Sequence, residues 1–196
     1  MRLPKTCTAF EGERRLATGN PKEVALAAKA ALERGLKGEL LIFDDQSGRL
    51  VDFDLSGEKE DVLDRLAALM RESAGDAEKK SGPGRPKLGV VSREVTLLPR
   101  HWEWLDRQTD SASAVLRRLV EAASRGEIPS ERMREAKDAA YRFMSAIAGN
   151  YAGFEEAARA LYAGNKERFD AIIAGWPDDV REHAQKLARP AFSAAR

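Results

Sequence analysis

The sequence predicts an α+β protein built from a small N-terminal ββαββα domain, a central strand-helix-helix segment and a C-terminal helical bundle. Three observations support this fold class. Short β-rich strings joined by turn residues fill the first part of the chain, a Gly/Pro-rich and charged stretch interrupts it, and alanine-rich helical patterns fill the last third. The predicted divisions are 1–72 (domain), 73–89 (linker), 90–126 (strand-helix-helix) and 127–196 (helices).

Two short strand candidates joined by a glycine turn open the chain, in TCTAFEGERRLAT (6–18). A helix-start signal follows, with Asn20 at the N-cap, Pro21 at the first helical position and Glu23 at the third. The helical pattern then ends at Gly35, a residue suited to a left-handed stop.

A second hairpin is predicted from ELLIFDD (39–45) and RLVDFDL (49–55), which flank the turn residues 46–48. In the second of these strings, apolar residues roughly alternate with aspartates, so we expect a strand with one wet face. An amphipathic helix should then begin near Ser56 and complete the ββαββα unit.

The charge of the chain is unevenly distributed. Residues 1–75 hold 12 basic and 14 acidic side chains, residues 76–125 hold 10 and 7, and residues 126–196 hold 11 of each. Within 79–100 there are six basic residues and one acidic residue. A local positive field on a nearly neutral chain indicates a localised anionic partner.

The central segment reads as a strand and two helices. VVSREVTLLP (90–99) is a strand candidate, and a helix should begin at Pro99 or Arg100. Asp110 and Ser111 are placed to cap a second helix that ends at Gly126.

The last section is predicted to be a compact bundle of helices. A long helix capped by Ser130 should stop at Gly149, and shorter helices follow. Asn165 is a cap candidate, and Trp176-Pro177-Asp178 opens a final helix to about residue 187.

The order and lengths of these central elements resemble the ribbon-helix-helix family of DNA-binding dimers. The residues that carry the resemblance are Val95-Thr96-Leu97-Leu98-Pro99, then Trp102 and Leu105, then Ser111 or Ser113, and finally Leu116, Leu119 and Val120. The resemblance implies a homodimer in which two chains pair one strand each, so that the ribbon enters the major groove of double-stranded DNA. Trp102 and Leu105 are expected in the core, with Trp104 partly exposed.

The resemblance also assigns faces to the strand. Val95 and Leu97 should face the helices, which leaves Ser92, Glu94, Thr96 and Leu98 toward DNA. Glu94 suits a phosphate-lined groove only if it accepts a hydrogen bond from a cytosine amino group. On the second helix, Arg117 and Arg118 either contact phosphates or form a solvated face.

The stretch GPGRPKLG resembles the AT-hook core, in which arginine enters a narrow A·T minor groove. Here the core is Gly84-Arg85-Pro86, followed by Lys87. Two readings remain open, an arm that contacts DNA and a plain solvated linker. The full set of predicted DNA contacts is Lys79, Lys80, Arg85, Lys87, Ser92, Glu94, Thr96, Arg100, Ser111, Ser113, Arg117 and Arg118.

Over nearly its whole length the chain also resembles an uncharacterised bacterial family of unknown function. TAFEG, VALAAKAAL, LLIFDD, GRPKLGVVSREVTLLPRHWEWL and FEEAARALYAG carry this resemblance. It specifies a family and implies no activity.

Several function classes lack their motifs. The sequence has no Walker loop, GxGxxG or nucleophile elbow, so we expect no enzyme and no cofactor. The two histidines, His101 and His183, lie in separate helices away from the single cysteine, Cys7, so a zinc site is not expected. Cys7 should be a small buried hydrophobe, and the aspartates around residues 44–54 suit an ordinary turn better than a metal site. No signal peptide or membrane span is recognisable, which predicts a cytoplasmic protein without membrane contact.

These observations favour a dimeric, sequence-preferring DNA-binding protein, a transcriptional regulator that uses a two-stranded ribbon and a Gly-Arg-Pro arm. The alternative is an antitoxin-like or adaptor protein that acts mainly through protein–protein contacts. In that case the N-terminal domain would bind the protein partner.

Overall fold

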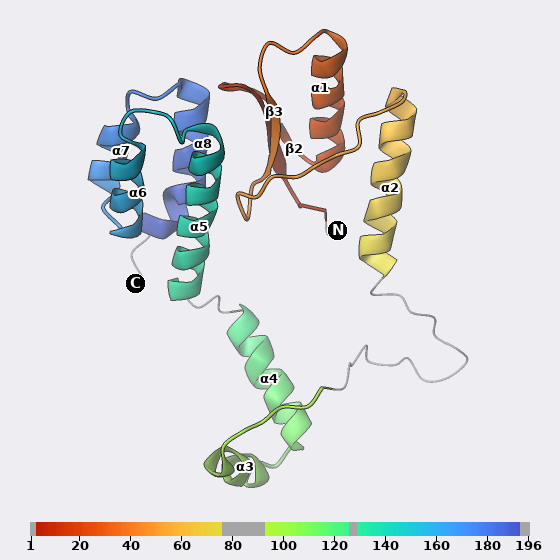
Figure 1. Ribbon diagram of the computed structural model, residues 1–196. Helices are drawn as coiled ribbons and strands as arrows, with labels where there is room; N and C mark the ends of the chain where they lie inside the picture. Colours follow the sequence, from red (N-terminus) through yellow and green to blue (C-terminus); the bar gives the residue numbers. More distant parts are fainter. Residues whose placement is uncertain (1–2, 76–92, 126–128, 193–196) are drawn as a thin grey trace.

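The computed structural model describes residues 3–75, 93–125 and 129–192, and its elements are arranged as Figure 1 shows. The elements are β1 (Cys7–Glu11), β2 (Arg14–Gly19), α1 (Pro21–Glu33), β3 (Leu40–Asp44), α2 (Lys59–Gly75), α3 (Pro99–Asp106), α4 (Ala112–Arg125), α5 (Pro129–Ile147), α6 (Phe154–Tyr162), α7 (Lys166–Ile173), α8 (Asp178–Ala188) and a 3-10 turn (Arg189–Phe192). No helix in these three ranges is long and apolar enough to cross a membrane. The three strands and the helices confirm the mixed α+β class.

The sheet is antiparallel, with strand order β2-β1-β3. Side chains along a strand alternate between the two faces of the sheet, and here both faces are buried. On one face Cys7, Ala9 and Ile42 pack against α1 and α2, and on the other Phe10 and Phe43 pack against the C-terminal helices. The sheet is thus the middle layer between two layers of helix (Figure 1).

The predicted start and stop signals of α1 are both present in the structure. The Asn20 side chain accepts hydrogen bonds from the backbone of Lys22 and Glu23, and the Glu23 carboxylate reaches back to the Asn20 N–H. This capping box satisfies N–H groups that the first helical turn leaves without partners. Gly35 follows α1 with φ of 82°, in the left-handed region expected for a helix stop.

The predicted second strand, RLVDFDL (49–55), does not form. This stretch pairs with β3 through one bridge, Phe43 to Leu50, and then leaves the sheet toward α2. Lys29 from α1 and Arg65 from α2 donate hydrogen bonds to four carbonyl oxygens between residues 54 and 57. Because side chains satisfy the carbonyls of residues 54–57, the chain can leave the sheet there without a neighbouring strand. The N-terminal order is therefore ββαβα.

The N-terminal and C-terminal parts share one core. Phe143 of α5 lies 4.9 Å from Phe43 and 5.5 Å from Phe10 between ring centroids, and α8 and the 3-10 turn complete the cluster. Burial of each large aromatic side chain contributes about 2 kcal/mol or more. The sheet and the helices after residue 129 therefore form a single body in this structure.

Helix boundaries in the second half differ slightly from expectation. The long helix α5 begins at Pro129, so Ser130 lies inside its first turn and is not its cap. Proline at a first helical position removes no hydrogen bond, which explains the earlier start. Asn165 caps α7 by accepting a hydrogen bond from Arg168 N, as predicted, and the short helices form a compact bundle. The predicted linker starts later than residue 73, because α2 continues to Gly75.

Gly48 fixes the contact between the β3 turn and α5. Its φ is +66°, and a Cβ built there would lie 2.0 Å from the carbonyl oxygen of Ala139 in α5. Arg142, one turn further along the same helix, donates a hydrogen bond to the Ser47 carbonyl at 2.9 Å. A side chain at position 48 would have to push the turn off the helix.

A buried polar cluster lies between the sheet and α8. The Asp45 carboxylate, 5% exposed, accepts hydrogen bonds from Thr8 Oγ1 at 2.7 Å and from Lys186 Nζ at 2.8 Å. His183 of α8 is 1% exposed and lies between the rings of Phe10 and Phe143. Its Nε2 is 3.7 Å from Asp45 Oδ1, too far for a hydrogen bond, and neither ring nitrogen has a partner.

Burial lowers the pKa of His183 to about 4, and the cations Lys186 and Arg15 act in the same direction while Asp45 opposes them. The folded protein therefore keeps this imidazole neutral at pH values where the unfolded chain protonates it, near 6.5. Folding loses stability as the pH falls from about 6.5 to about 4, because the unfolded state binds the extra proton.

The substitution Gly48→Ala is expected to lower the free energy of unfolding by about 3 kcal/mol or more, through both left-handed strain and the clash with Ala139. Gly164→Ala is the matched control, since Gly164 has φ of +72° and open space around it. Its expected cost is about 1 kcal/mol. Urea denaturation of both variants measures the difference. Equal costs would contradict the close contact with α5.

His183→Leu is expected to reduce acid sensitivity. Between pH 7.5 and pH 5 the wild-type protein should lose about 2 kcal/mol more of its unfolding free energy than the variant does, given the pKa of about 4. Urea titrations of both proteins at the two pH values test this. Parallel losses in wild type and variant would show that His183 is not the titrating group.

Candidate nucleic-acid interface

The two central helices form close to their predicted bounds. Pro99 occupies the first turn of α3, and the backbone carbonyl of Leu98 accepts from His101 N at 2.8 Å. At the start of α4, Ser111 Oγ accepts from Ala114 N at 3.4 Å, which confirms it as the cap residue. The two helices pack on each other and stand clear of the sheet and the C-terminal helices in Figure 1.

The predicted ribbon strand lies partly outside the described residues. Its described part, 93–98, is neither helix nor strand in this single chain and does not join the three-stranded sheet. Val95 is 56% exposed, although the strand pattern places it toward the helices. A ribbon needs a strand from a second chain, so ribbon pairing stays a prediction.

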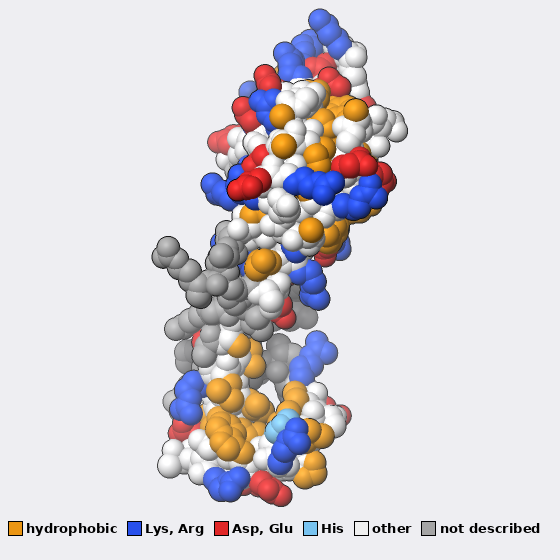
Figure 2. All heavy atoms as spheres, turned by 90° about the vertical axis from the view of Figure 1, so that its left-hand side faces the viewer, with side chains coloured by type: hydrophobic (Ala, Val, Ile, Leu, Met, Phe, Trp, Pro, Cys, Tyr) orange, Lys and Arg blue, Asp and Glu red, His pale blue; other side chains and the backbone are white. Residues whose placement is uncertain are grey.

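The small core of this segment leaves apolar side chains in solvent. Leu105 and Val115 are buried, but Trp102, expected beside Leu105 in the core, is 40% exposed. The reason is size, because two short helices cannot enclose a large indole. Trp104 is also exposed, as predicted. Figure 2 shows hydrophobic side chains gathered on the part of the surface formed by this segment.

We call this surface the central apolar face. Its members share high exposure and large apolar side chains, and they are Val95, Leu98, Trp102, Trp104, Leu119 and Val120. These are six of the eleven exposed large hydrophobic residues in the described ranges, on a segment of under thirty residues. Patches of this kind mark interaction sites in folded proteins.

The predicted DNA contacts divide into two groups. Lys79, Lys80, Arg85, Lys87 and Ser92 lie outside the described residues. The others are all exposed, and they are Glu94, Thr96, Arg100, Ser111, Ser113, Arg117 and Arg118.

Four of these residues, Ser111, Ser113, Arg117 and Arg118, lie at the cap and in the first half of α4. Arg117 Nε donates to the Ser113 carbonyl at 3.2 Å, and Arg118 pairs with Asp110 at 3.1 Å. Both members of the second pair are more than half exposed, so it contributes little stability and can exchange for another anion. Two serines and two arginines at a helix start can contact a phosphate backbone.

The aspartates of the predicted second hairpin do not converge on a metal site. Asp44 accepts hydrogen bonds from Gln46 N and Ser47 Oγ in a turn, as its sequence suggests. Hydrogen bonds from the Ser56 hydroxyl and backbone lower the pKa of Asp54. Among the described residues, no group of three or more metal-ligating side chains is present.

Sequence reasoning missed the Asp45–His183 contact. The sequence predicts Asp45 as a turn residue, yet its carboxylate lies buried against Thr8 and Lys186. Cys7 is fully buried as expected, and burial raises the pKa of its thiol to about 12. No local pattern links positions 45 and 183, so only the tertiary fold could reveal their contact.

Comparison with known proteins identifies a family without an assigned activity. Residues 6–188 match the family described as "Uncharacterized protein conserved in bacteria (DUF2239)". Neither the curated proteins nor the solved structures contain a match. Since the match covers most of the chain, this protein belongs to the uncharacterised bacterial family DUF2239.

Proposed function

We propose that this protein is a homodimeric DNA-binding protein, a transcriptional regulator whose segment 79–125 contacts the duplex. The observation that carries the proposal is the central apolar face beside an unpaired segment, 93–98, that leads directly into two helices. A ribbon-helix-helix dimer requires this order of elements and this exposed apolar surface in each separate chain.

A dimer would stabilise the central segment, whose own core is small. Among the described side chains of segment 93–125, the buried large apolar residues are Leu105 and Val115. Chain segments below about 40 residues usually need oligomerisation or another stabilising partner. A second copy supplies the same apolar surface and a second strand, so one two-fold contact covers both. The described segment carries six arginines and five acidic residues, so two copies do not repel strongly.

The charge around the central segment suits an anionic partner such as DNA. The six basic residues within 79–100 and the arginines of α4 place positive charge around the proposed ribbon. Thr96 and the serines at the start of α4 are exposed donors for base edges or phosphates. Contacts to phosphates would supply most of the affinity and make it depend on salt.

Leu119→Glu should convert the dimer into a single chain. In an isolated subunit Leu119 is exposed, so the substitution should cost little, but an unpaired charge buried at the dimer contact costs several kcal/mol. Leu32→Glu on α1 is the matched control, because Leu32 has a similar exposure and lies on the body. Light scattering after size exclusion gives the masses. A wild-type protein with the mass of one chain would contradict the proposal.

Arg85→Ala with Lys87→Ala should weaken duplex binding across sequences and flatten its salt dependence. Loss of two cationic contacts is expected to reduce the slope of log affinity against log salt by about 2. Lys22→Ala with Arg168→Ala removes two exposed cations from the body and serves as the control. Gel shifts on A·T-rich duplexes, and on duplexes from upstream of the protein's own gene, measure the binding of the double variant and of its control. Absence of retardation by the wild type at low salt would end the DNA-binding proposal.

A further inference from the structure

Helix α8 is attached to the rest of the protein mainly through small apolar side chains. Its buried residues are Val180, His183, Ala184, Leu187 and Ala188. Three of these five are alanine or histidine, which bury little apolar area, whereas α5 buries Phe143 and Met144 completely. Elements that bury little apolar surface open at a lower cost in free energy than the rest of a fold.

The polar contacts between α8 and the sheet are ion pairs that solvent can reach. Lys186 Nζ lies 2.8 Å from Asp45 Oδ2. On β2, the Arg15 guanidinium lies 2.9 Å from Glu182 Oε2 and 3.3 Å from Asp179 Oδ1. At least one side chain of each pair is about one third exposed or more, so screening by water limits what each pair contributes.

His183 is the one ionisable side chain among the five buried residues of α8. Its ring lies between Phe10 of β1 and Phe143 of α5, with centroid distances of 5.5 and 4.6 Å. Neither ring nitrogen has a hydrogen-bond partner within the described residues, and Asp45 Oδ1 lies 3.7 Å from Nε2. A protonated imidazole would therefore have no acceptor at bonding distance while α8 stays in place.

The groups that face His183 favour its neutral form. The strand β1 and helix α5 present aromatic rings to it, α8 presents Lys186, and β2 presents Arg15. The carboxylate of Asp45 acts in the opposite direction, but it is already paired with Lys186. Burial, opposed by Asp45 and aided by the two cations, lowers the pKa of His183 to about 4.

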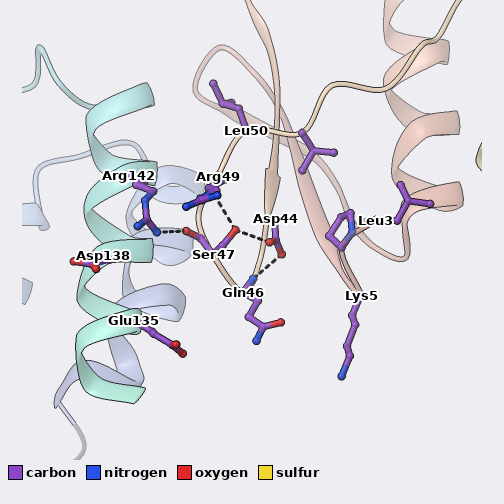
Figure 3. Close-up of a pocket in the computed structure, with 12 residues that line it drawn as sticks. Leu3, Lys5, Asp44, Gln46, Ser47, Arg49, Leu50, Glu135, Asp138 and Arg142 are labelled. Atoms are coloured by element: carbon purple, nitrogen blue, oxygen red, sulfur yellow. Dashed lines mark hydrogen bonds between the residues drawn. The ribbon is translucent and has the colours of Figure 1, made fainter. Parts of the chain in front are cut away.

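Opening of α8 would leave the sheet attached to α5. The rings of Phe43 and Phe143 are in contact, with centroids 4.9 Å apart. Figure 3 shows the pocket beside this contact, where Arg142 of α5 reaches the turn after β3 and donates a hydrogen bond to the Ser47 carbonyl at 2.9 Å. Neither contact involves α8, so the sheet and α5 can stay together when α8 moves away.

We propose that α8 is an acid-sensitive switch, in which protonation of His183 releases the helix from the sheet and from α5 while the rest of the body stays folded. The open state uncovers the rings of Phe10 and Phe143, against which His183 packs. Opening becomes more favourable as the pH falls from about 6.5, the pKa of a solvated imidazole, to about 4, that of the buried ring. The switch lies in the body and does not depend on DNA binding by 79–125.

Amide hydrogen exchange of the full chain at pH 7.5 and pH 5 tests the switch. After correction for intrinsic exchange rates, the opening constant of the α8 amides should rise about thirtyfold between these pH values. At pH 5 these amides should be at least about tenfold less protected than those of α1, which packs on the opposite face of the sheet. Their exchange should also depend less on added urea, because opening of one helix exposes less surface than unfolding.

His183→Gln is the matched control, since it keeps a polar side chain that cannot take up a proton. This variant should lose the rise in α8 opening between pH 7.5 and pH 5. His183→Leu should lose it as well and should protect α8 more strongly at both pH values, because an apolar side chain suits the buried site. Circular dichroism and the urea midpoint at pH 7.5 check that both variants fold.

Two results would overturn the switch. Equal protection and equal urea dependence of α8 and α1 in the wild-type protein would show that acid unfolds the chain as one unit. A thirtyfold rise that persists in His183→Gln would show that another group takes up the proton. The first comparison uses the wild-type protein, so its result holds whether or not a variant folds.

Discussion

The burial of Phe10 and Phe43 sets the organisation of this protein. Both rings lie on one face of a three-stranded sheet, and the helices that cover them come from the far end of the chain. Exposing two phenylalanine rings on this face to water would cost several kcal/mol, so the N-terminal strands depend on α5 and α8 for their stability. Gly48, which allows the β3 turn to touch α5, and the Asp45–Lys186 ion pair hold the same contact at its polar margin.

This shared core makes the central helices an insertion. The chain leaves the body after α2, forms α3 and α4, and returns at α5. Three residues, 126–128, separate the end of α4 from the start of α5, while residues 76–98 separate the end of α2 from the start of α3. A three-residue connection spans at most about 10 Å, so the body must stay close to the end of α4. Although the body lies near the end of α4, it leaves the apolar side chains of the insertion exposed. These side chains are therefore available to a partner surface.

The parts of the fold that sequence could predict are those decided by local chemistry. Asn20, Pro21 and Glu23 form a capping box whatever else the chain does, and Gly35 ends the helix because of its own φ. The strand predicted at 49–55 does not form, and at its end the carbonyls of Asp54 and Leu55 accept from Arg65 and Lys29, side chains distant in sequence. The DNA contacts predicted in α4 are exposed and close together, but the pattern of a helix cannot show what surface it meets. Helical periodicity likewise predicts Trp102 in a core beside Leu105, but in this single chain its side chain is 40% exposed.

The central apolar face is the group of large apolar side chains that the fold of one chain leaves exposed. The central apolar face gains free energy from almost any apolar surface, because the hydrophobic effect is not directional, and a second copy is the partner always present in equal amount. The proposed homodimer would cover this face with the same residues of a second copy, since a two-fold contact uses one surface twice.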